Sequence, residues 1–230
     1  MKLTPADIVV LIPAFNEGEV IQATLQKLIA VGYTIVVVDD GSADHTWEQL
    51  QTMPVHALRH AINRGQGAAL QTAMSYALNL DPAAVVHFDA DGQHNPADIG
   101  ALVQPISDGD ADIVLGSRFL RPQDRQAVPA ARRLLLRLAS MVNGLMTGMW
   151  LSDAHNGARA LSQHALRSIH LQEDGFAHAT EILQQIRTHK LRYKEVPTNI
   201  RYTEYSRHKG QRFWNAFDIL FDLFLGRIFK

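Results

Sequence analysis

The sequence predicts an α/β protein built on a doubly wound, mostly parallel β-sheet. Short apolar runs alternate with segments of helical periodicity between Asp7 and Arg118, and this alternation is typical of parallel strands joined by crossover helices. The run from Thr34 to Val38 is uninterrupted and mostly β-branched, as expected for a strand buried on both faces. Polar clusters follow the strands, and ligands bind such sheets beyond the carboxyl ends of the strands.

Proline and glycine residues indicate where the expected strands and helices begin and end. Pro13 is expected to end the first strand and Gly32 the first helix, while Pro96 suits the first turn of a later helix. The expected strands cover 7–12, 34–38, 55–59, 85–88, 113–115, 191–196 and 198–202. The expected helices cover 17–31, 43–51, 68–80 and 96–107, with further helical patterns near 132–149 and after Gly175.

Composition restricts the class of protein. The chain of 230 residues is long enough for one large domain, and its net charge of −1 does not favour nucleic acid as a partner. The absence of cysteine excludes disulfides and thiolate metal sites. The N-terminus lacks a signal-peptide core, and the uncharged stretch 138–152 is shorter than the about 20 residues of a spanning helix. We therefore expect a cytoplasmic protein that contacts the membrane peripherally, on its cytoplasmic face.

Two carboxylates end the apolar run at 85–88. Asp89 and Asp91 are separated by one residue, so on a strand they would face the same side about 6.6 Å apart. Gly92 permits a turn that aims both at one point. Such a pair repels itself unless a cation lies between, and Mg²⁺ or Mn²⁺ binds carboxylate oxygens in this way. An ordinary solvated Asp-rich turn is the alternative explanation.

Five polar clusters are expected at one edge of the sheet. They occupy 13–17, 39–42, 63–67, 89–93 and 117–118, each beyond an expected strand. Because the carboxyl ends of parallel strands share an edge, these clusters are expected to form one site.

The clusters carry a family resemblance. The residues concerned are Ile12-Pro13-Ala14-Phe15-Asn16-Glu17, Val37-Val38-Asp39-Asp40-Gly41-Ser42, Asn63-Arg64-Gly65-Gln66-Gly67-Ala68-Ala69 and Asp89-Ala90-Asp91-Gly92-Gln93-His94. In order and spacing they resemble the family 2 glycosyltransferases of the GT-A fold. Gly116-Ser117-Arg118-Phe119 and Asp153-Ala154-His155-Asn156-Gly157-Ala158-Arg159-Ala160 look most like the polyprenyl-phosphate sugar transferases, such as dolichol-phosphate mannosyltransferases.

The resemblance implies roles for the residues of the first half. Base and ribose of a nucleotide-sugar would be held by Pro13, Ala14, Phe15 and Glu17. Asp40 would accept a hydrogen bond from the base, unless it caps the following helix. The loop with Asn63, Gly65 and Gly67 would let the backbone approach the nucleotide. Asp89, Asp91 and the Gln93 carbonyl would bind Mg²⁺ or Mn²⁺, with Ala90 beside the substrate and Asp91 also catalytic.

The second half supplies candidate acceptor groups. Arg118, Arg132 and Arg133 suit a phosphate, and an apolar helical stripe from 134 to 149 follows them. This stripe fits either a core or dimer helix or a membrane role. Glu181 is at a position where related enzymes place an acid near the acceptor, and it equally fits a surface residue.

The C-terminal residues are expected to form two further features. Arg207 and Lys209 belong to a basic loop that either closes over a diphosphate or is simply solvated. We expect a GT-A domain over 1–210 and a separate amphipathic helix over 211–230, whose broad aromatic face suits a membrane plane or a membrane partner protein.

The predicted activity is inverting, metal-dependent transfer of a sugar from a GDP- or UDP-linked donor to a polyprenyl phosphate. A lipid phosphate is already anionic near neutral pH, whereas a hydroxyl acceptor needs a base. Transfer to a sugar hydroxyl and a non-catalytic nucleotide-sugar-binding subunit remain alternatives, as does a homo-oligomer. A nucleotidyltransferase is disfavoured because residues 13–17 contain neither glycine nor lysine.

Overall fold

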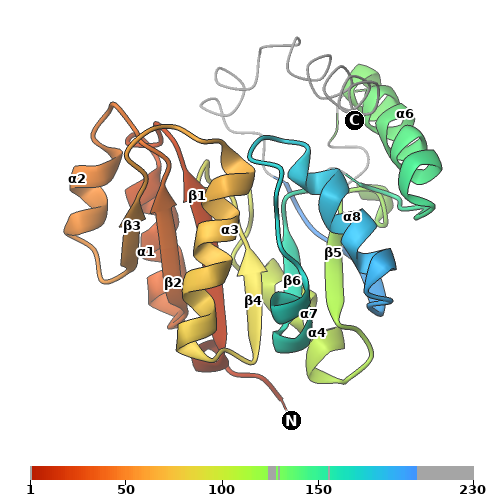
Figure 1. The fold of residues 1–230 in the computed structure, drawn as a ribbon, viewed down its shortest axis with the longest axis horizontal. Helices are drawn as coiled ribbons and strands as arrows, with labels where there is room; N and C mark the ends of the chain where they lie inside the picture. Colours follow the sequence, from red (N-terminus) through yellow and green to blue (C-terminus); the bar gives the residue numbers. More distant parts are fainter. Residues whose placement is uncertain (1, 124–127, 129, 155, 201–230) are drawn as a thin grey trace.

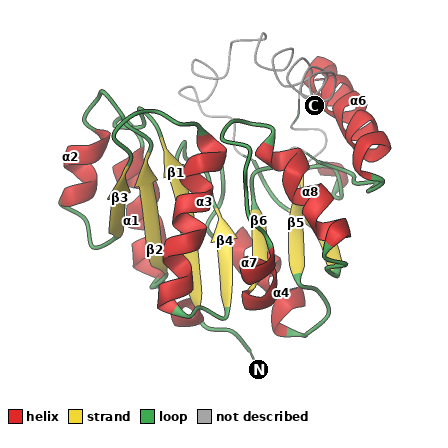
Figure 2. Ribbon diagram, in the orientation of Figure 1, coloured by secondary structure: helices red, strands yellow, loops and turns green. Residues whose placement is uncertain are grey.

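The computed structural model describes residues 2–123, 128, 130–154 and 156–200. Strands form a single central layer, and helices cover both of its faces (Figures 1 and 2). The expected helix at 211–230 and the basic loop with Arg207 and Lys209 lie outside the described residues.

The elements alternate along the chain much as predicted. The strands are β1 (Ile8–Ala14), β2 (Thr34–Asp39), β3 (His56–Arg59), β4 (Ala84–His87), β5 (Ile113–Ser117), β6 (Arg159–Ser162) and β7 (Tyr193–Pro197). The helices are α1 (Ile21–Val31), α2 (Thr46–Gln51), α3 (Gln66–Ala77), α4 (Asp98–Ser107), α6 (Ala130–Thr147), α7 (Gln163–Ser168) and α8 (His178–Thr188), with 3-10 turns η1 (Pro5–Asp7) and η2 (Leu78–Leu80). None of these helices is long and apolar enough to cross a bilayer.

The sheet has seven strands in the order β3-β2-β1-β4-β6-β5-β7. All neighbouring pairs are parallel except those of β6, which runs antiparallel to both β4 and β5. The predicted mostly parallel α/β sheet is therefore confirmed. The sequence analysis did not predict β6, a four-residue strand that begins with a charged residue.

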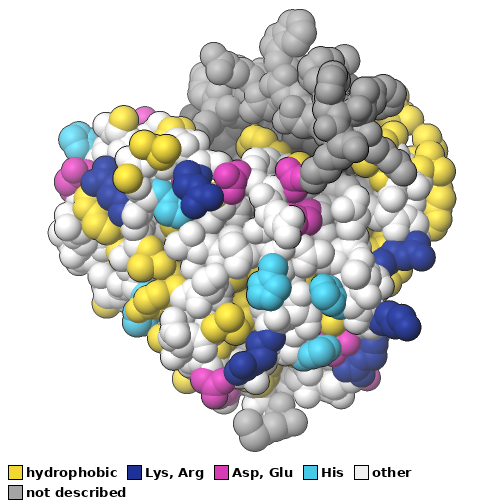
Figure 3. Space-filling model, in the orientation of Figure 1, with side chains coloured by type: hydrophobic (Ala, Val, Ile, Leu, Met, Phe, Trp, Pro, Cys, Tyr) yellow, Lys and Arg dark blue, Asp and Glu magenta, His cyan; other side chains and the backbone are white. Residues whose placement is uncertain are grey.

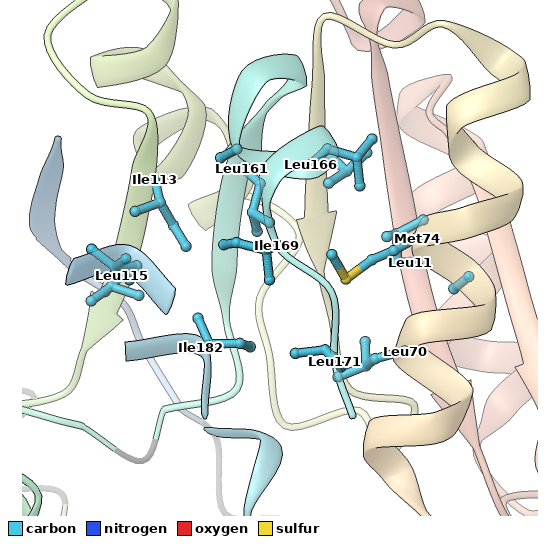
Figure 4. Packing of buried hydrophobic residues seen from close by; sticks show 14 of the residues in the cluster. Leu11, Leu70, Met74, Ile113, Leu115, Leu161, Leu166, Ile169, Leu171 and Ile182 are labelled. Carbon is cyan, nitrogen blue, oxygen red and sulfur yellow. The ribbon is translucent and has the colours of Figure 1, made fainter. Parts of the chain in front are cut away.

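Side-chain alternation along the strands divides the core into two layers. Leu11, Val36 and Val38 face α3, α7 and α8, where they pack with residues such as Met74 and Ile182 (Figure 4). Ile12, Ile35 and Val37 face the other side and pack against α1, α2 and α4. Burial on both faces explains why the central strands are continuous apolar runs.

Two element ends differ from the prediction. Pro13 lies inside β1 and pairs with Val38, instead of ending the strand. On its other side β1 pairs with β4 only as far as Leu11, so Pro13 has one strand neighbour, as at a sheet edge where a missing N–H is tolerated. The helix α1 begins at Ile21 because Asn16 has a φ of 52° and the Glu17 amide bonds to Thr46 Oγ1 at 2.8 Å.

Candidate active site

The polar clusters meet at the carboxyl edge of the sheet, as predicted. The segments after β1 and β2 are joined by the Asn16 amide, which donates to Ser42 Oγ at 2.9 Å, and by the Ala43 amide, which donates to Asn16 Oδ1 at 2.9 Å. The start of α3 reaches the end of β4, because Gln66 Nε2 donates to Asp89 Oδ1 at 3.2 Å. The four segments therefore form one continuous rim.

The end of β1 presents one exposed aromatic ring to this rim. Phe15 is 40% exposed, whereas Ala14 is buried in the strand and Glu17 is only 9% exposed. Pro13 lies within β1 and is partly buried. Of these four predicted nucleotide-binding residues, Phe15 has the side chain best placed for stacking against a planar base.

Asp40 has different contacts from those expected. It is 2% exposed, and its carboxylate accepts hydrogen bonds from the Arg64 amide at 3.0 Å and the Gly65 amide at 2.7 Å. His60 Nδ1 lies 2.6 Å from the same carboxylate. Asp40 does not cap α2, which begins at Thr46. It instead fixes the loop after β3, on which Asn63 is exposed.

The glycines at the start of α3 accommodate protein backbone. A Cβ at Gly67 would lie 2.0 Å from the Glu173 carbonyl oxygen, and one at Gly65 would lie 2.4 Å from the Asp174 carbonyl oxygen. The Gly67 amide donates to that Asp174 oxygen at 2.7 Å. The close approach expected for a nucleotide is thus made here by the segment 173–174.

Glu181 holds the same segment. Its carboxylate accepts from the Gln172 amide at 2.9 Å and the Glu173 amide at 3.0 Å. Gln185 Nε2 donates to it as well, at 3.1 Å. This carboxylate therefore helps to fix a loop, and its role as an acid near the acceptor stays a prediction.

The acidic pair occupies a tight turn after β4. Gly92 has a φ of 73°, as the turn requires. Ala90 is buried, and its carbonyl oxygen accepts a hydrogen bond from Thr24 Oγ1 at 3.2 Å. Asp89 Oδ2 lies 2.7 Å from His94 Nε2, and Asp91 Oδ1 accepts from the Gln93 amide at 3.0 Å. The Ala90 carbonyl thus fixes the turn to α1, and its contact with substrate stays a prediction.

Electrostatics favour a cation between the two carboxylates. Burial and the neighbouring Asp89 raise the pKa of Asp91. Burial would also raise the pKa of Asp89, but His94 and Arg159 hold it below its ordinary value. Within the described residues no third His, Cys, Asp or Glu completes a metal cluster. Two carboxylates fit Mg²⁺ or Mn²⁺, which takes its remaining ligands from water and substrate phosphates.

The sequence analysis assigned no role to Gly157 and Arg159. A Cβ at Gly157 would lie 2.6 Å from Asp89 Oδ2, so only glycine lets β6 begin beside this carboxylate. Arg159 is 2% exposed and pairs with His87 across β4 and β6. Burial lowers its pKa to about 10, while Asp89 and Asp153 favour its charge. Their signal in the sequence was the Gly157-Ala158-Arg159 run within the family motif at 153–160.

Two buried histidines adjoin Arg159 and remain neutral. Burial, with the charge of Arg159, lowers the pKa of His87 to about 3 and that of His178 to about 4. Neither ring of the pair therefore carries charge at neutral pH, and Arg159 is the cation of this cluster. We conclude that Arg159 is the buried countercharge behind the acidic pair.

Arg118 is also part of a buried pair. Its Nε lies 2.6 Å from Asp153 Oδ2, and its Nη2 lies 2.7 Å from Asp153 Oδ1. The guanidinium therefore makes a bidentate ion pair with Asp153, and its role at the acceptor phosphate stays a prediction. Arg133 is half-buried on α6, and the Arg132 side chain lies outside the description.

The mostly parallel seven-stranded sheet with an acidic strand end is the architecture of the GT-A fold, and sequence comparison agrees. The model of "Glycosyl transferase family 2" matches residues 9–169. The chain therefore belongs to glycosyl transferase family 2, and it is a glycosyltransferase.

Individual relatives extend the match over nearly the whole chain. A UDP-N-acetylglucosamine–dolichyl-phosphate N-acetylglucosaminyltransferase of Methanococcus voltae is 31% identical, over 97% of this chain and 97% of its own. A dolichol-phosphate mannosyltransferase of Pyrococcus furiosus is 32% identical, over 76% of this chain and 51% of its own. Glucosyl-3-phosphoglycerate synthase of Mycobacterium tuberculosis, in complex with Mn²⁺, UDP and phosphoglyceric acid, shares the fold with a TM-score of 0.67. That match has 16% identity and covers 93% of this chain and 75% of the other.

Gly157→Ala tests the packing of β6 against Asp89. The added methyl group would displace the carboxylate, and we expect Mn²⁺ affinity to fall by about 10–100-fold, as for other substitutions that disturb ligand orientation. The measurement is titration of Mn²⁺ by electron paramagnetic resonance. Gly100→Ala is the matched control, since a Cβ there meets no atom within 4 Å. Equal Mn²⁺ affinity in both variants would contradict this account.

Removing Arg118 is expected to act mainly on stability. Arg118→Ala leaves Asp153 buried without its partner, which costs about 3–5 kcal/mol of unfolding free energy. Asp153→Ala should cost a similar amount, and the double variant less than the sum. Urea denaturation of all three measures the coupling. Should Arg118→Ala unfold like the wild type, the ion pair would have no structural role.

Proposed function

We propose that this chain transfers a sugar, with inversion, from a GDP- or UDP-linked donor to a polyprenyl phosphate with the help of Mg²⁺ or Mn²⁺. The observation that carries the proposal is the partly buried carboxylate pair at the strand end, with the raised pKa of Asp91. A group whose ionised form is disfavoured without a partner is well suited to bind a divalent cation. The Mn²⁺ and UDP in the Mycobacterium tuberculosis neighbour support this assignment.

Different residues at the rim would bind the base, the nucleotide backbone and the metal ion. Phe15 would stack on the base, while the loop fixed by Asp40 would flank the nucleotide. Asp89, Asp91 and the Gln93 carbonyl would hold the metal. The bound metal neutralises the charge that develops on the departing nucleoside diphosphate. Arg159 favours the ionised form of Asp89, and Gly157 leaves room for its carboxylate.

The acceptor assignment is supported by the contacts of Glu181, the base that the sequence analysis suggested, and by the names of two relatives. A phosphomonoester is already anionic near neutral pH, since its second pKa is about 6. A hydroxyl acceptor must lose its proton during attack, which requires a positioned base. Glu181, the base that the sequence suggested, is engaged by backbone amides of residues 172 and 173. The Methanococcus and Pyrococcus relatives are named as transferases that act on dolichyl or dolichol phosphate, which supports a polyprenyl phosphate acceptor.

The lipid acceptor places the enzyme at a membrane. A polyprenyl phosphate is held in a bilayer by its tail, and nucleotide-sugars are soluble. We therefore propose that the chain works peripherally on the cytoplasmic face.

Asp91→Asn tests the metal assignment. Loss of the charge should weaken the metal and lower kcat/KM by about 100-fold or more, while the protein stays folded. Asp108→Asn, which changes an exposed carboxylate bonded to Gln104, is the control. The assay is release of nucleoside diphosphate from a panel of GDP- and UDP-sugars with Mg²⁺ or Mn²⁺. Wild-type turnover by Asp91→Asn in metal-free buffer would refute the assignment.

Comparing polyprenyl phosphate with the corresponding polyprenol tests the acceptor. We expect labelled sugar to enter the organic phase with the phosphate and not with the alcohol. Glu181→Gln should retain transfer within about tenfold, because no base is needed and general base catalysis is typically worth more than that. If Glu181→Gln is inactive and labelled product stays in the aqueous phase, the acceptor is a soluble glycan hydroxyl.

A further inference from the structure

Helix α6 turns its polar side toward the protein. Its buried side chains are short and polar: Ser140, Asn143 and Thr147. Ser140 Oγ accepts from the Ala154 amide at 3.1 Å, and Asn143 Nδ2 donates to Thr180 Oγ1 of α8 at 3.0 Å. α6 is therefore attached to the rest of the domain through these hydrogen bonds and through half-buried apolar side chains such as Leu136 and Met146.

The opposite side of α6 is apolar and exposed. Leu134, Leu138, Met141 and Leu145 are 62%, 48%, 49% and 70% exposed. Their spacing of four, three and four residues puts them on one face of the helix. Trp150, 65% exposed, packs its ring over Gly144, where a Cβ would lie 2.8 Å from the ring. We refer to these five residues as the α6 apolar surface, and hydrophobic side chains gather in this region at the right edge of Figure 3.

This arrangement reverses the usual amphipathic pattern. A surface helix in a globular protein directs its apolar stripe toward the core and its polar face toward water. Exposed leucines scattered singly are common, but a contiguous stripe marks an interaction site. Because the stripe stays exposed while the other sides of α6 contact the domain, the α6 apolar surface is open to an external partner.

The positive charge of α6 indicates which kind of partner binds the α6 apolar surface. α6 contains three arginines and no acidic residue. Arg133 and Arg137 each precede a leucine of the stripe and so lie along one margin of it. Two copies meeting through this face would bring like charges together, whereas an anionic bilayer would attract them. A basic helix with an apolar face of this kind lies in the plane of a membrane interface.

The position of α6 agrees with this interaction. It lies at the same end of the molecule as the carboxyl ends of the parallel strands, where the acidic pair lies (Figure 1). A bilayer contacted by α6 would therefore be near the catalytic edge, and a lipid acceptor could reach that edge without leaving the bilayer.

We infer that the α6 apolar surface docks on an anionic lipid bilayer, with its leucines in the boundary between headgroups and acyl chains. The purpose of this docking rests on the proposed function, since it brings a lipid acceptor to the enzyme. The docking itself requires no substrate and can be tested without one.

The test is co-sedimentation of the full chain with phosphatidylcholine vesicles, with and without phosphatidylglycerol. We expect binding to the anionic vesicles, and we expect Leu138→Glu/Leu145→Glu to weaken it by about tenfold or more. Val31→Glu is the matched control, since Val31 on α1 is 48% exposed, as is Leu138. The milder Leu138→Ala/Leu145→Ala retains helix propensity and should weaken binding by a smaller factor. Arg137→Gln should reduce only the phosphatidylglycerol-dependent part.

Unchanged vesicle binding by the double glutamate variant would overturn the inference. So would a dimer of the wild type that becomes a monomer in this variant while neither binds vesicles, because a second copy would then cover the surface. Vesicle binding that depends on the leucines, without transfer to polyprenyl phosphate, would refute the proposed acceptor and leave the docking intact. If the protein transfers sugar to polyprenyl phosphate in detergent but never binds vesicles, the docking is refuted and the proposed acceptor stands.

Discussion

Repulsion between Asp89 and Asp91 is the constraint on which the catalytic edge depends. Two carboxylates one residue apart at the end of a buried strand are unstable unless positive charge is close. The structure supplies that charge from two directions: His94 contacts Asp89 at 2.7 Å, and Arg159 lies buried behind it. These groups compensate Asp89 but leave the pKa of Asp91 raised. The remaining imbalance is what a divalent ion, bound with the substrate diphosphate, would remove.

The antiparallel strand β6 makes this compensation possible. It lies between β4 and β5 and carries Arg159 at its start. Gly157, just before it, lets the chain pass against the Asp89 carboxylate. Asp153, a few residues earlier, holds Arg118 at the end of β5. One short segment thus links the two strand ends that carry the acidic pair and the neighbouring arginine, so the site depends on sheet order as much as on the motifs.

Local patterns predicted what depends on local physics. Apolar runs followed by polar residues predicted the ends of the strands near Asp39, His87 and Ser117. The class of sheet and the polar rim at its carboxyl edge were therefore predictable from the sequence. Roles set by tertiary contacts were not predicted: Glu181 binds amides of the loop that precedes α8, Asp40 binds the loop after β3, and Arg118 contacts Asp153. The four residues of β6 have no strand periodicity to detect. The apolar stripe of α6 was evident, but its outward direction follows only from the contacts of its polar side.

The central claim is that Asp89 and Asp91 together hold a divalent ion in this chain. The most direct measurement is anomalous scattering from a crystal of the full chain grown with Mn²⁺ and a nucleoside diphosphate. The account predicts an anomalous peak between the two carboxylates, about 2.0–2.2 Å from an oxygen of each, with the diphosphate on its open side. A bound nucleotide with no anomalous peak at these carboxylates, or a peak coordinated elsewhere, would contradict it.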